Sequence, residues 1–226
     1  DRYRRQRQMC IRDRYIGNLK FNRAKMQKKE KYNNKELINY LGDDKCIVFG
    51  STWERDEEII FDYMSEEFNK NVKYIIAPHE VSEKNINRIK SKLNNKVNLL
   101  SDNKYNAQNN ILIIDTIGVL KYLYKFSHIS YVGGGFKKKG LHNILEPCVY
   151  GNPVIFGKYF KFSNEAKALI KLKVGFSIQN SKQLMNTING LLFNANKLKE
   201  IEIINSKFID ENLVSINSII KSMQNE

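Results

Sequence analysis

Short apolar runs alternate with amphipathic segments along most of this 226-residue chain. Six runs are of strand length: KCIVFGS (45–51), VKYIIAP (72–78), KVNLL (96–100), NILIIDT (110–116), HISYVGGG (128–135) and NPVIFG (152–157). The segments 52–68, 82–93, 116–126, 143–151, 163–172 and 181–193, and the tail from 196 onward, are predicted to be helical. Strands that alternate with helices predict a Rossmann-like α/β fold, a parallel sheet with helices on both faces.

The composition agrees with a folded chain, since 42% of the residues are apolar. We expect Trp53, Tyr63 and Phe68 to lie in the core. No apolar run is long enough for a membrane-spanning helix, and no export leader is recognised, so we expect a soluble chain in the cytoplasm. The three cysteines have no metal-binding spacing, which argues against a metal site built from cysteine.

The chain has a formal charge of +14, and its arginines are concentrated at the start. Residues 1–14 hold six of the nine arginines and two aspartates, so this segment contributes +4 and the rest +10. Its arginine bias and its repeated DRY predict a non-native lead-in, and a native basic arm is the alternative. The remaining charge favours an anionic partner: a nucleotide, a phosphorylated lipid surface or nucleic acid.

Ligands of such folds bind beyond the carboxyl ends of the strands, which predicts where the site lies. The strand-end sequences are 50–52, 78–80, 115–118 and the glycine-rich stretch 133–146. In that stretch His142 and Asn143 precede a helical segment, whose N-terminus suits a phosphate. Glu146, about one turn into the helix, is placed to accept hydrogen bonds from ribose hydroxyls. Alternatively, the glycines only form a tight turn that His142 and Asn143 cap.

Several motifs occur in an order that resembles a known family. They are YIGNLKFNR (15–23), FGSTWERDEE (49–58), IIAPHE (75–80), DTIGVL (115–120) and VGGGFKKKGLHNILEP (132–147), followed by GNPVIFG and EAKAL. Together they resemble the donor-binding half of the 3-deoxy-D-manno-octulosonic acid (Kdo) transferases, which attach Kdo to lipid A precursors in lipopolysaccharide biosynthesis.

The resemblance implies a GT-B architecture, in which two Rossmann-like domains face each other across a cleft. It divides the chain into an inter-domain crossing segment (15–33) and a CMP-Kdo-binding domain (34–226), with the N-terminal acceptor domain absent. The family's general base, a glutamate, and its membrane-associating face belong to that absent domain. No catalytic residue is therefore assigned here, and the fragment alone is expected to be inactive. The partners implied are CMP-Kdo, a lipid A precursor and the cytoplasmic face of the bacterial inner membrane.

The resemblance also implies which residues bind the donor, with no further cofactor. We expect no metal, because CMP carries a single phosphate and the sequence has no Asp-x-Asp pair. The implied CMP contacts are Pro78, His79, Ile117, Gly118, Val119, Asn143, Ile144, Leu145 and Glu146. Weaker candidates for substrate binding are Ser51, Gly134 and His142. For Ser51 a helix-capping role is equally expected, and for His142 a structural hydrogen bond.

The chain departs from the family pattern at three places. Pro78 is followed by His79 without the usual arginine, Val119 replaces a glutamate and Leu141 replaces a glycine. The phosphate thus lacks one expected cation, and the lysine run 137–139 is a candidate substitute, unless it is only solvated.

The implied reaction is an inverting displacement, in which an acceptor hydroxyl attacks C2 of Kdo and CMP leaves. Two classes of alternative remain open: a UDP-dependent glycosyltransferase or epimerase of the same fold, and a basic nucleic-acid-binding module. The scarcity of arginine after residue 23 argues against nucleic acid. A fragment with no function of its own is a further possibility.

Overall fold

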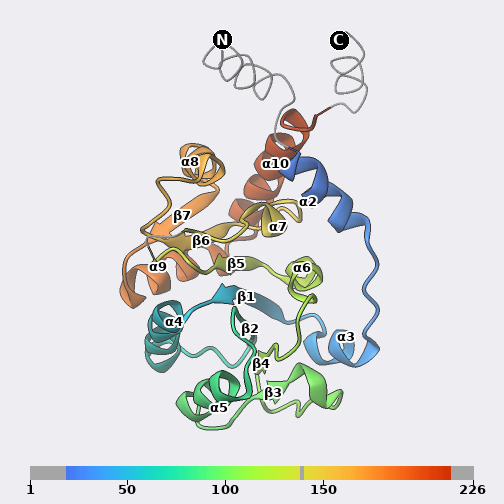
Figure 1. The fold of residues 1–226 in the computed structure, drawn as a ribbon, viewed down its shortest axis with the longest axis vertical. Coiled ribbons are helices and arrows are strands. Elements are labelled where there is room, and N and C mark those ends of the chain that lie inside the picture. The colour runs from blue at the N-terminus through green and yellow to red at the C-terminus, as the bar shows by residue number, and fades with distance from the viewer. Residues whose placement is uncertain (1–18, 138–139, 215–226) are drawn as a thin grey trace, which may run out of the picture.

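The computed structural model describes residues 19–137 and 140–214, which form one seven-stranded parallel sheet flanked by helices (Figure 1). The strand order is β3-β4-β2-β1-β5-β6-β7. The strands are β1 (Lys45–Thr52), β2 (Val72–Pro78), β3 (Asn98–Leu99), β4 (Ile111–Ile113), β5 (Ile129–Val132), β6 (Val154–Gly157) and β7 (Gly175–Ile178). The predicted fold class is confirmed. The predicted lead-in and residues 15–18 of the crossing segment lie outside the described residues.

Helices cover both faces of the sheet. Figure 1 shows α4, α5 and α9 on one side, and α3 and α6 on the other. The helices are α2 (Lys20–Lys29), α3 (Lys35–Leu41), α4 (Glu54–Glu66), α5 (Glu83–Lys92), α6 (Leu120–Leu123), α7 (Leu145–Cys148), α8 (Asn164–Lys171), α9 (Ser181–Leu192) and α10 (Ala195–Glu211), with 3₁₀ turns η1 (Leu100–Asp102) and η2 (Tyr124–Phe126). None of these helices is both long and apolar enough to cross a bilayer.

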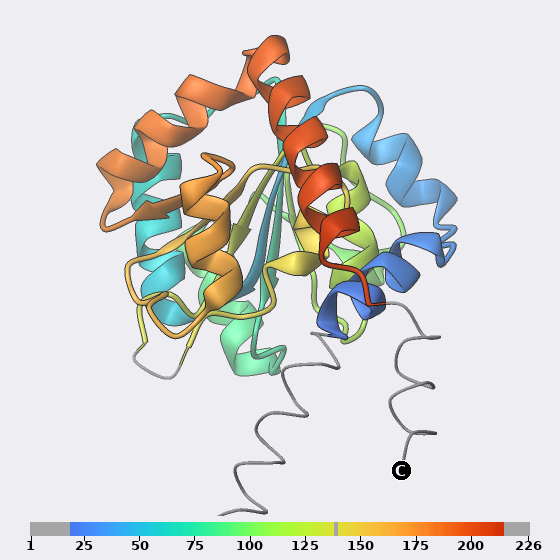
Figure 2. The same cartoon turned by 90° about the horizontal axis from the view of Figure 1, so that it is seen from above.

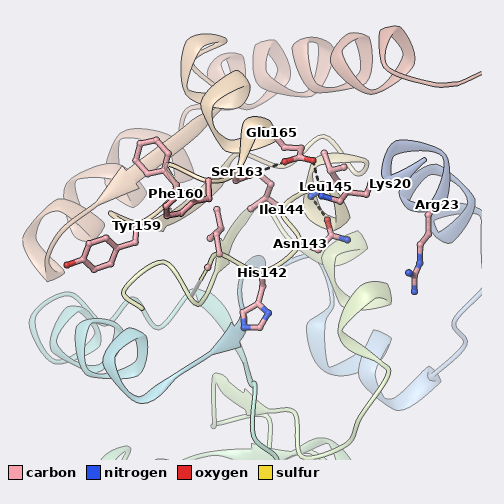
Figure 3. Close-up of a pocket in the computed structure, with 13 residues that line it drawn as sticks. Lys20, Arg23, His142, Asn143, Ile144, Leu145, Tyr159, Phe160, Ser163 and Glu165 are labelled. Carbon is pink, nitrogen blue, oxygen red and sulfur yellow. Dashed lines mark hydrogen bonds and ion pairs between the residues drawn. The ribbon is translucent and has the colours of Figure 1, made fainter. Parts of the chain in front are cut away.

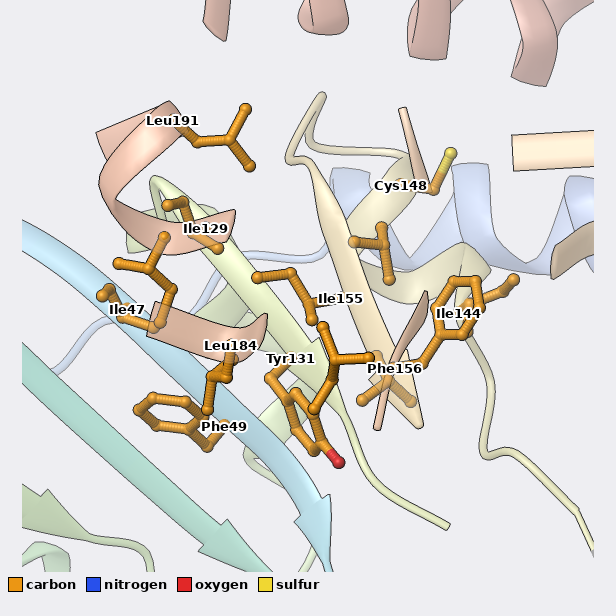
Figure 4. Packing of buried hydrophobic residues seen from close by; sticks show 14 of the residues in the cluster. Ile47, Phe49, Ile129, Tyr131, Ile144, Cys148, Ile155, Phe156, Leu184 and Leu191 are labelled. Carbon is orange, nitrogen blue, oxygen red and sulfur yellow. The ribbon is translucent and has the colours of Figure 1, made fainter. Parts of the chain in front are cut away.

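Alternating side chains of the central strand supply the two cores. Ile47 and Phe49 of β1 face the larger cluster with α4 and α9, whereas Cys46 and Val48 face the smaller cluster with α3 and η2. Figure 4 shows Ile47 and Phe49 packed near Leu184 of α9. Because successive residues of a strand point to opposite faces, a strand buried on both sides is apolar at nearly every position. This explains why the sequence pattern of β1 predicted a buried strand.

The order of the strands reverses direction at β1. Its neighbours are β2 on one side and β5 on the other. The chain therefore runs from β1 to β2 toward one edge of the sheet, and from β5 to β6 toward the opposite edge. A crevice opens at such a switch point beyond the carboxyl ends of the strands. At the end of β1 the register with β2 shifts, and Ser51 there has a φ of 52°, in the left-handed region.

Several predicted element boundaries were wrong. The predicted helix 116–126 begins only at Leu120, because Gly118 has a φ of +91°, which a right-handed helix cannot contain. The strand predicted at 96–100 is reduced to Asn98–Leu99. The edge strand β7 and the helices α2 and α3 were not predicted. Phe68 lies beyond α4 and is 42% exposed, so its assignment to the core was wrong, whereas Tyr63 is buried.

Helix α2 is packed against the end of the chain that the structure describes (Figure 2). The ring of Phe21 is buried and meets Phe208 of α10 edge to face, at 5.4 Å between ring centroids. Asn22 donates to the carbonyl of Val214 at 2.9 Å and accepts from its amide at 3.0 Å. The segment 20–29 is therefore packed as part of this domain.

Candidate donor-binding site

The predicted site residues follow four different strands, at one edge of the sheet. Ser51 is the penultimate residue of β1, Pro78 ends β2 and His79 follows it. The segment 117–119 follows β4, and the segment 134–146 follows β5. Since all seven strands are parallel, their carboxyl ends lie at the same edge. The structure thus brings segments together that are up to 95 positions apart in the sequence, from Ser51 to Glu146.

The glycine-rich loop after β5 is packed tightly against other strands' ends. A Cβ atom at Gly133 would lie 2.2 Å from the Ser51 carbonyl oxygen, and one at Gly135 would lie 2.4 Å from the Gly157 nitrogen. These two positions require glycine because backbones approach each other closely there. This agrees with the alternative that the glycines serve to form a tight turn. Gly140 differs, because it has a φ of +120° and a Cβ there would meet no atom within 4 Å. That part of the loop borders open space.

The buried carboxylate of Asp56 fastens this loop to the start of α4. It accepts hydrogen bonds from the Trp53 amide (2.9 Å), the Gly134 amide (3.0 Å) and the Tyr131 hydroxyl (2.6 Å). A buried charge needs such partners, and the three donors also fix the relative position of two loops. Sequence reasoning missed Asp56, because the predicted helix began at residue 52, whereas α4 begins at Glu54 and has Asp56 at its third position, where an acidic residue caps the helix.

Trp53 stacks with the two site histidines. Its ring centroid lies 4.2 Å from that of His79, and His79 lies 4.6 Å from His142. The indole Nε1–H donates to Nε2 of His142 at 2.9 Å, and the Lys137 ammonium lies 3.4 Å from the indole centroid. Trp53 is only half-buried, so the prediction that it belongs to the core was wrong. Its position directly after the strand-end Ser51-Thr52 was the available signal.

The environment of His142 favours the neutral imidazole. Burial is the largest cause that lowers its pKa below the ordinary value, followed by the charge of nearby His79. Lys137 lowers the pKa further, whereas Asp56 raises it. The backbone amide of His142 also donates to the Gly133 carbonyl at 3.2 Å. The structural hydrogen bond that we considered for His142 is therefore present, through both its amide and its ring.

Asn143 and Glu146 lie at the start of α7. The helix has a single turn, and Glu146 is its second residue rather than one turn inside it. The Asn143 side chain accepts from the Leu145 amide at 3.2 Å and donates to Glu146 Oε1 at 3.2 Å. Asn143 thus satisfies the amide of the first residue of α7, although Ile144 occupies the N-cap position. A helix dipole arises from several aligned turns. The single turn of α7 therefore provides a weaker positive potential for a phosphate than we expected from the sequence.

Glu146 is a half-buried carboxylate with cations nearby. Burial raises its pKa above the ordinary value, while the Asn143 hydrogen bond and the charges of Arg23 and Lys121 lower it. Lys121 pairs with Glu30 at 2.7 Å, and the Tyr122 hydroxyl donates to the same Glu30 oxygen at 2.7 Å. Glu146 therefore retains unused acceptor capacity in a partly desolvated place, which suits hydroxyl groups of a ligand.

A cavity of about 440 Å³ borders this cluster (Figure 3). The 140–145 segment forms one wall, α2 contributes Lys20 and Arg23, and the segment after β6 contributes aromatic rings. Among these rings Phe162 is 94% exposed. Lys20 and Glu165 form an ion pair across the rim at 3.3 Å. The cavity is large enough for a sugar-sized ligand beside His142 and Asn143.

The remaining predicted residues are more loosely placed. Ile117 is 86% exposed, Gly118 borders open space, and Val119 packs against the smaller core. Pro78 is buried at the end of β2, and Ile144 and Leu145 are buried in the larger core. Ser51 is not the N-cap of α4, since Trp53 occupies that position, so the capping alternative for Ser51 was wrong.

Metal ligands are not assembled in the part of the chain that the structure describes. Within residues 19–137 and 140–214 no group of three or more His, Cys, Asp or Glu side chains could hold a metal ion. The two described cysteines, Cys46 and Cys148, are both buried, and burial raises the pKa of each thiol to about 12. Both are therefore thiols rather than thiolates at neutral pH.

Comparison with known proteins shows which proteins are related to this chain. No family model matches. A bifunctional glycosyltransferase/methyltransferase of Fusobacterium nucleatum is 35% identical over 91% of this chain and 32% of its own length. The 3-deoxy-D-manno-octulosonic acid transferase of Rickettsia prowazekii is 33% identical over 87% of this chain and 44% of its own length. The chain thus spans less than half the length of these curated relatives.

Solved structures show the same fold. The C-terminal CMP-Kdo binding domain of WaaA from Acinetobacter baumannii superposes with a TM-score of 0.69 at 21% identity, over 83% of this chain and 96% of that domain. A putative UDP-N-acetylglucosamine 2-epimerase from Listeria monocytogenes matches with a TM-score of 0.55 at 15% identity, over 83% of this chain and 46% of that protein. The fold is that of one Rossmann-like half of the two-domain GT-B proteins. By its sequence, the chain is homologous to the 3-deoxy-D-manno-octulosonic acid transferases, over less than half of their length.

Proposed function

We propose that this chain is the donor-binding domain of an inverting glycosyltransferase that moves Kdo from CMP-Kdo to a lipid A precursor. The proposal is supported by the relatives named as Kdo transferases. The similar solved domain is described as binding CMP-Kdo, and the chain spans nearly all of that domain. The boundaries that we propose are 15–33 for the crossing segment and 34–226 for the domain, although α2 packs onto the domain.

One observation carries the assignment of the site: Glu146, a half-buried glutamate with spare acceptor capacity, is hydrogen-bonded to Asn143, which lines the cavity beyond the strand ends. We assign Glu146 to the ribose hydroxyls. Asn143 and Arg23 line the same region, and we assign them to the phosphate; Arg23 is then the cation that the loop after β2 lacks. The η2 turn, which follows α6, packs against α7.

The other residues take supporting roles in this proposal. The 117–119 backbone receives the cytosine, since a base can approach Gly118 without meeting a Cβ. Pro78, His79, Ile144 and Leu145 shape the wall. Ser51, Gly134 and His142 remain candidates for the sugar or phosphate. For Gly134 the contact would have to use its carbonyl, because its amide already donates to Asp56.

The chemistry proposed is displacement of CMP from C2 of Kdo by an acceptor hydroxyl. CMP leaves with a single phosphate, whose developing charge hydrogen-bond donors can stabilise. The base that deprotonates the acceptor is expected in the part of the relatives that this chain does not span. Since the acceptor is a lipid and the donor is a nucleotide sugar, we place the reaction at the cytoplasmic face of the bacterial inner membrane.

Calorimetric titration of the chain with CMP tests the proposal, with UMP and UDP as competing nucleotides. We expect CMP to bind more tightly than either, and Glu146→Ala to weaken CMP binding about tenfold or more, because a charged acceptor of ribose hydroxyls is lost. Glu200→Ala is the matched control, since Glu200 is an exposed carboxylate on α10. A folded chain that prefers UDP, or that binds CMP equally well without Glu146, would contradict the assignment.

A further inference from the structure

The contact between Trp53 and His142 joins two loops that the sequence places 89 positions apart. The indole is a donor only, so the ring nitrogen that accepts its hydrogen bond must carry a lone pair. The receiving atom is Nε2 of His142, at 2.9 Å. In a neutral imidazole the single proton then belongs to the other nitrogen, Nδ1.

The packing of the ring shows which of its edges faces the glycine loop. A Cβ at Gly134 would lie 3.0 Å from Cδ2 of His142, so the Cδ2–Nε2 edge of the ring is held against the glycine loop and Trp53. The Nδ1–Cε1 edge is the opposite one. Nδ1 has no hydrogen-bond partner in the described part of the chain, and His142 lines the cavity next to Asn143.

We propose that Trp53 is a positioning residue that fixes His142 as the neutral imidazole with its proton on Nδ1, so that His142 presents one N–H donor to the donor nucleotide's phosphate. The inference rests on the proposed function for the identity of the anion. The assignment of the tautomer does not depend on the ligand, because it rests on the hydrogen bond from Trp53 to His142. Asp56 completes the arrangement, since it binds the backbone amides of both Trp53 and Gly134.

The charged groups around His142 decide how firmly this state is held. His79 from the loop after β2 and Lys137 from the glycine loop oppose a second proton, whereas Asp56 from the first turn of α4 favours one. Protonation at Nε2 would also break the hydrogen bond from Trp53. A neutral donor binds a phosphate without the pH dependence that an imidazolium would introduce near pH 7.

Nitrogen-15 NMR of the labelled chain tests the tautomer without any ligand. The chain has three histidines, and the spectrum of a His142→Gln variant identifies the resonances of His142. We expect its proton on Nδ1 and a titration midpoint below 6.5, the ordinary value. Trp53→Phe keeps an aromatic ring beside His79 but removes the N–H donor. In that variant we expect a mixture of tautomers and a higher midpoint. An Nε2-protonated ring in the wild type, or unchanged spectra in Trp53→Phe, would overturn the proposal.

Binding measurements test the role of Nδ1, with CMP and cytidine as probes that differ in the phosphate. We expect Trp53→Phe to weaken CMP about tenfold and cytidine by less than about threefold, as for one lost hydrogen bond to a charged group. An asparagine amide occupies the place of Nδ1 and a glutamine amide that of Nε2. His142→Asn should therefore retain CMP affinity within about threefold, and His142→Gln should lose about tenfold.

The outcomes separate this inference from the proposed function. A wild-type chain that binds neither CMP nor cytidine contradicts the proposed function, while the spectra still decide the tautomer. Binding of CMP with equal losses in His142→Asn and His142→Gln contradicts the role given to Nδ1. If Trp53→Phe does not fold, the wild-type tautomer and the two His142 variants decide the question.

Discussion

Glu146 lies where a ligand could bind, but its environment disfavours the ionised carboxylate. Its carboxylate is half-buried, and burial raises its pKa above 4.5, the ordinary value. A raised pKa means that ionisation of this group weakens the folded state, since the folded chain holds the proton more tightly than the unfolded chain does. Binding residues often carry such a cost, because the chain is selected for binding rather than for stability at that position.

The pH dependence of stability should therefore change in a Glu146→Gln variant, which cannot ionise. The stabilising contribution of the protonated Glu146 is present in full below pH 4.5 and is lost as the pH rises through the folded-state pKa. We expect the variant to gain free energy of unfolding relative to the wild type over that window and to remain the more stable at pH 7. Urea unfolding from pH 4 to 8 measures the difference. A difference that does not vary with pH would contradict this explanation.

At the scale of single residues, the sequence predicted positions better than roles. His142, Asn143 and Glu146 do lie together at the strand ends, because the strand–helix alternation determines where each loop emerges. Trp53 was assigned to the core because hydrophobicity alone cannot distinguish a ring buried under a helix from one stacked on histidines 26 and 89 positions away. Such contacts depend on the tertiary fold.

The loops and strand ends are held together by backbone packing, as Gly135 and Gly157 show. Their backbones approach so closely that a Cβ on either would overlap the other. The Gly135 carbonyl also accepts from the Tyr159 amide at 2.7 Å, so the loop cannot move away freely. This contact joins the loop after β5 to the end of β6. It also holds Tyr159, which lines the cavity, in place.

Two alanine substitutions should therefore have opposite effects on stability. Gly135→Ala should destabilise the chain by about 1–3 kcal/mol, since the added methyl group meets backbone atoms. Gly190→Ala is the control: this glycine lies near the end of α9 with open space around its Cβ position, and we expect a gain of about 0.5–1 kcal/mol from helix propensity. Chemical denaturation measures both. Equal destabilisation by the two would exclude the packing argument.

Elements were predictable where their apolar pattern was strong. β1, β2 and β5 are apolar at nearly every buried position, and α8 and α9 have a clear apolar face. The edge strand β7 reads GFSI, in which half-buried Phe176 and exposed Ser177 interrupt the apolar run. Helix α2 is mostly lysine, arginine, asparagine and glutamine, with only Phe21 and Ala24 buried, so its sequence alone carries little helical signal.

At the scale of the whole molecule, α2 contributes to the stability of the domain. Phe21→Ala removes a buried ring that contacts α10, and we expect a loss of about 3 kcal/mol. Met26→Ala is the matched control on the same helix, since Met26 is exposed, and its effect should stay within about 0.5 kcal/mol. Thermal unfolding compares the two variants. Equal melting temperatures would show that the domain folds independently of α2.

The sequence predicted the overall architecture because parallel sheets impose a strong pattern. Each buried strand must be followed by a helix that crosses back, which makes the alternation readable along the chain. The seven-stranded order, with β1 beside β5, could not be predicted in the same way. It depends on which faces the helices cover, and that in turn depends on contacts such as those between α4 and α9.

The paired hydrogen bonds between Asn22 and Val214 have a consequence for the order of folding. They join residues 192 positions apart, so they close a loop that contains every strand of the sheet. The entropy needed to close so long a loop is small only once the sheet has already brought its ends near each other. We therefore expect α2 to dock in the last step of folding and to exchange its amide hydrogens before the central strands do.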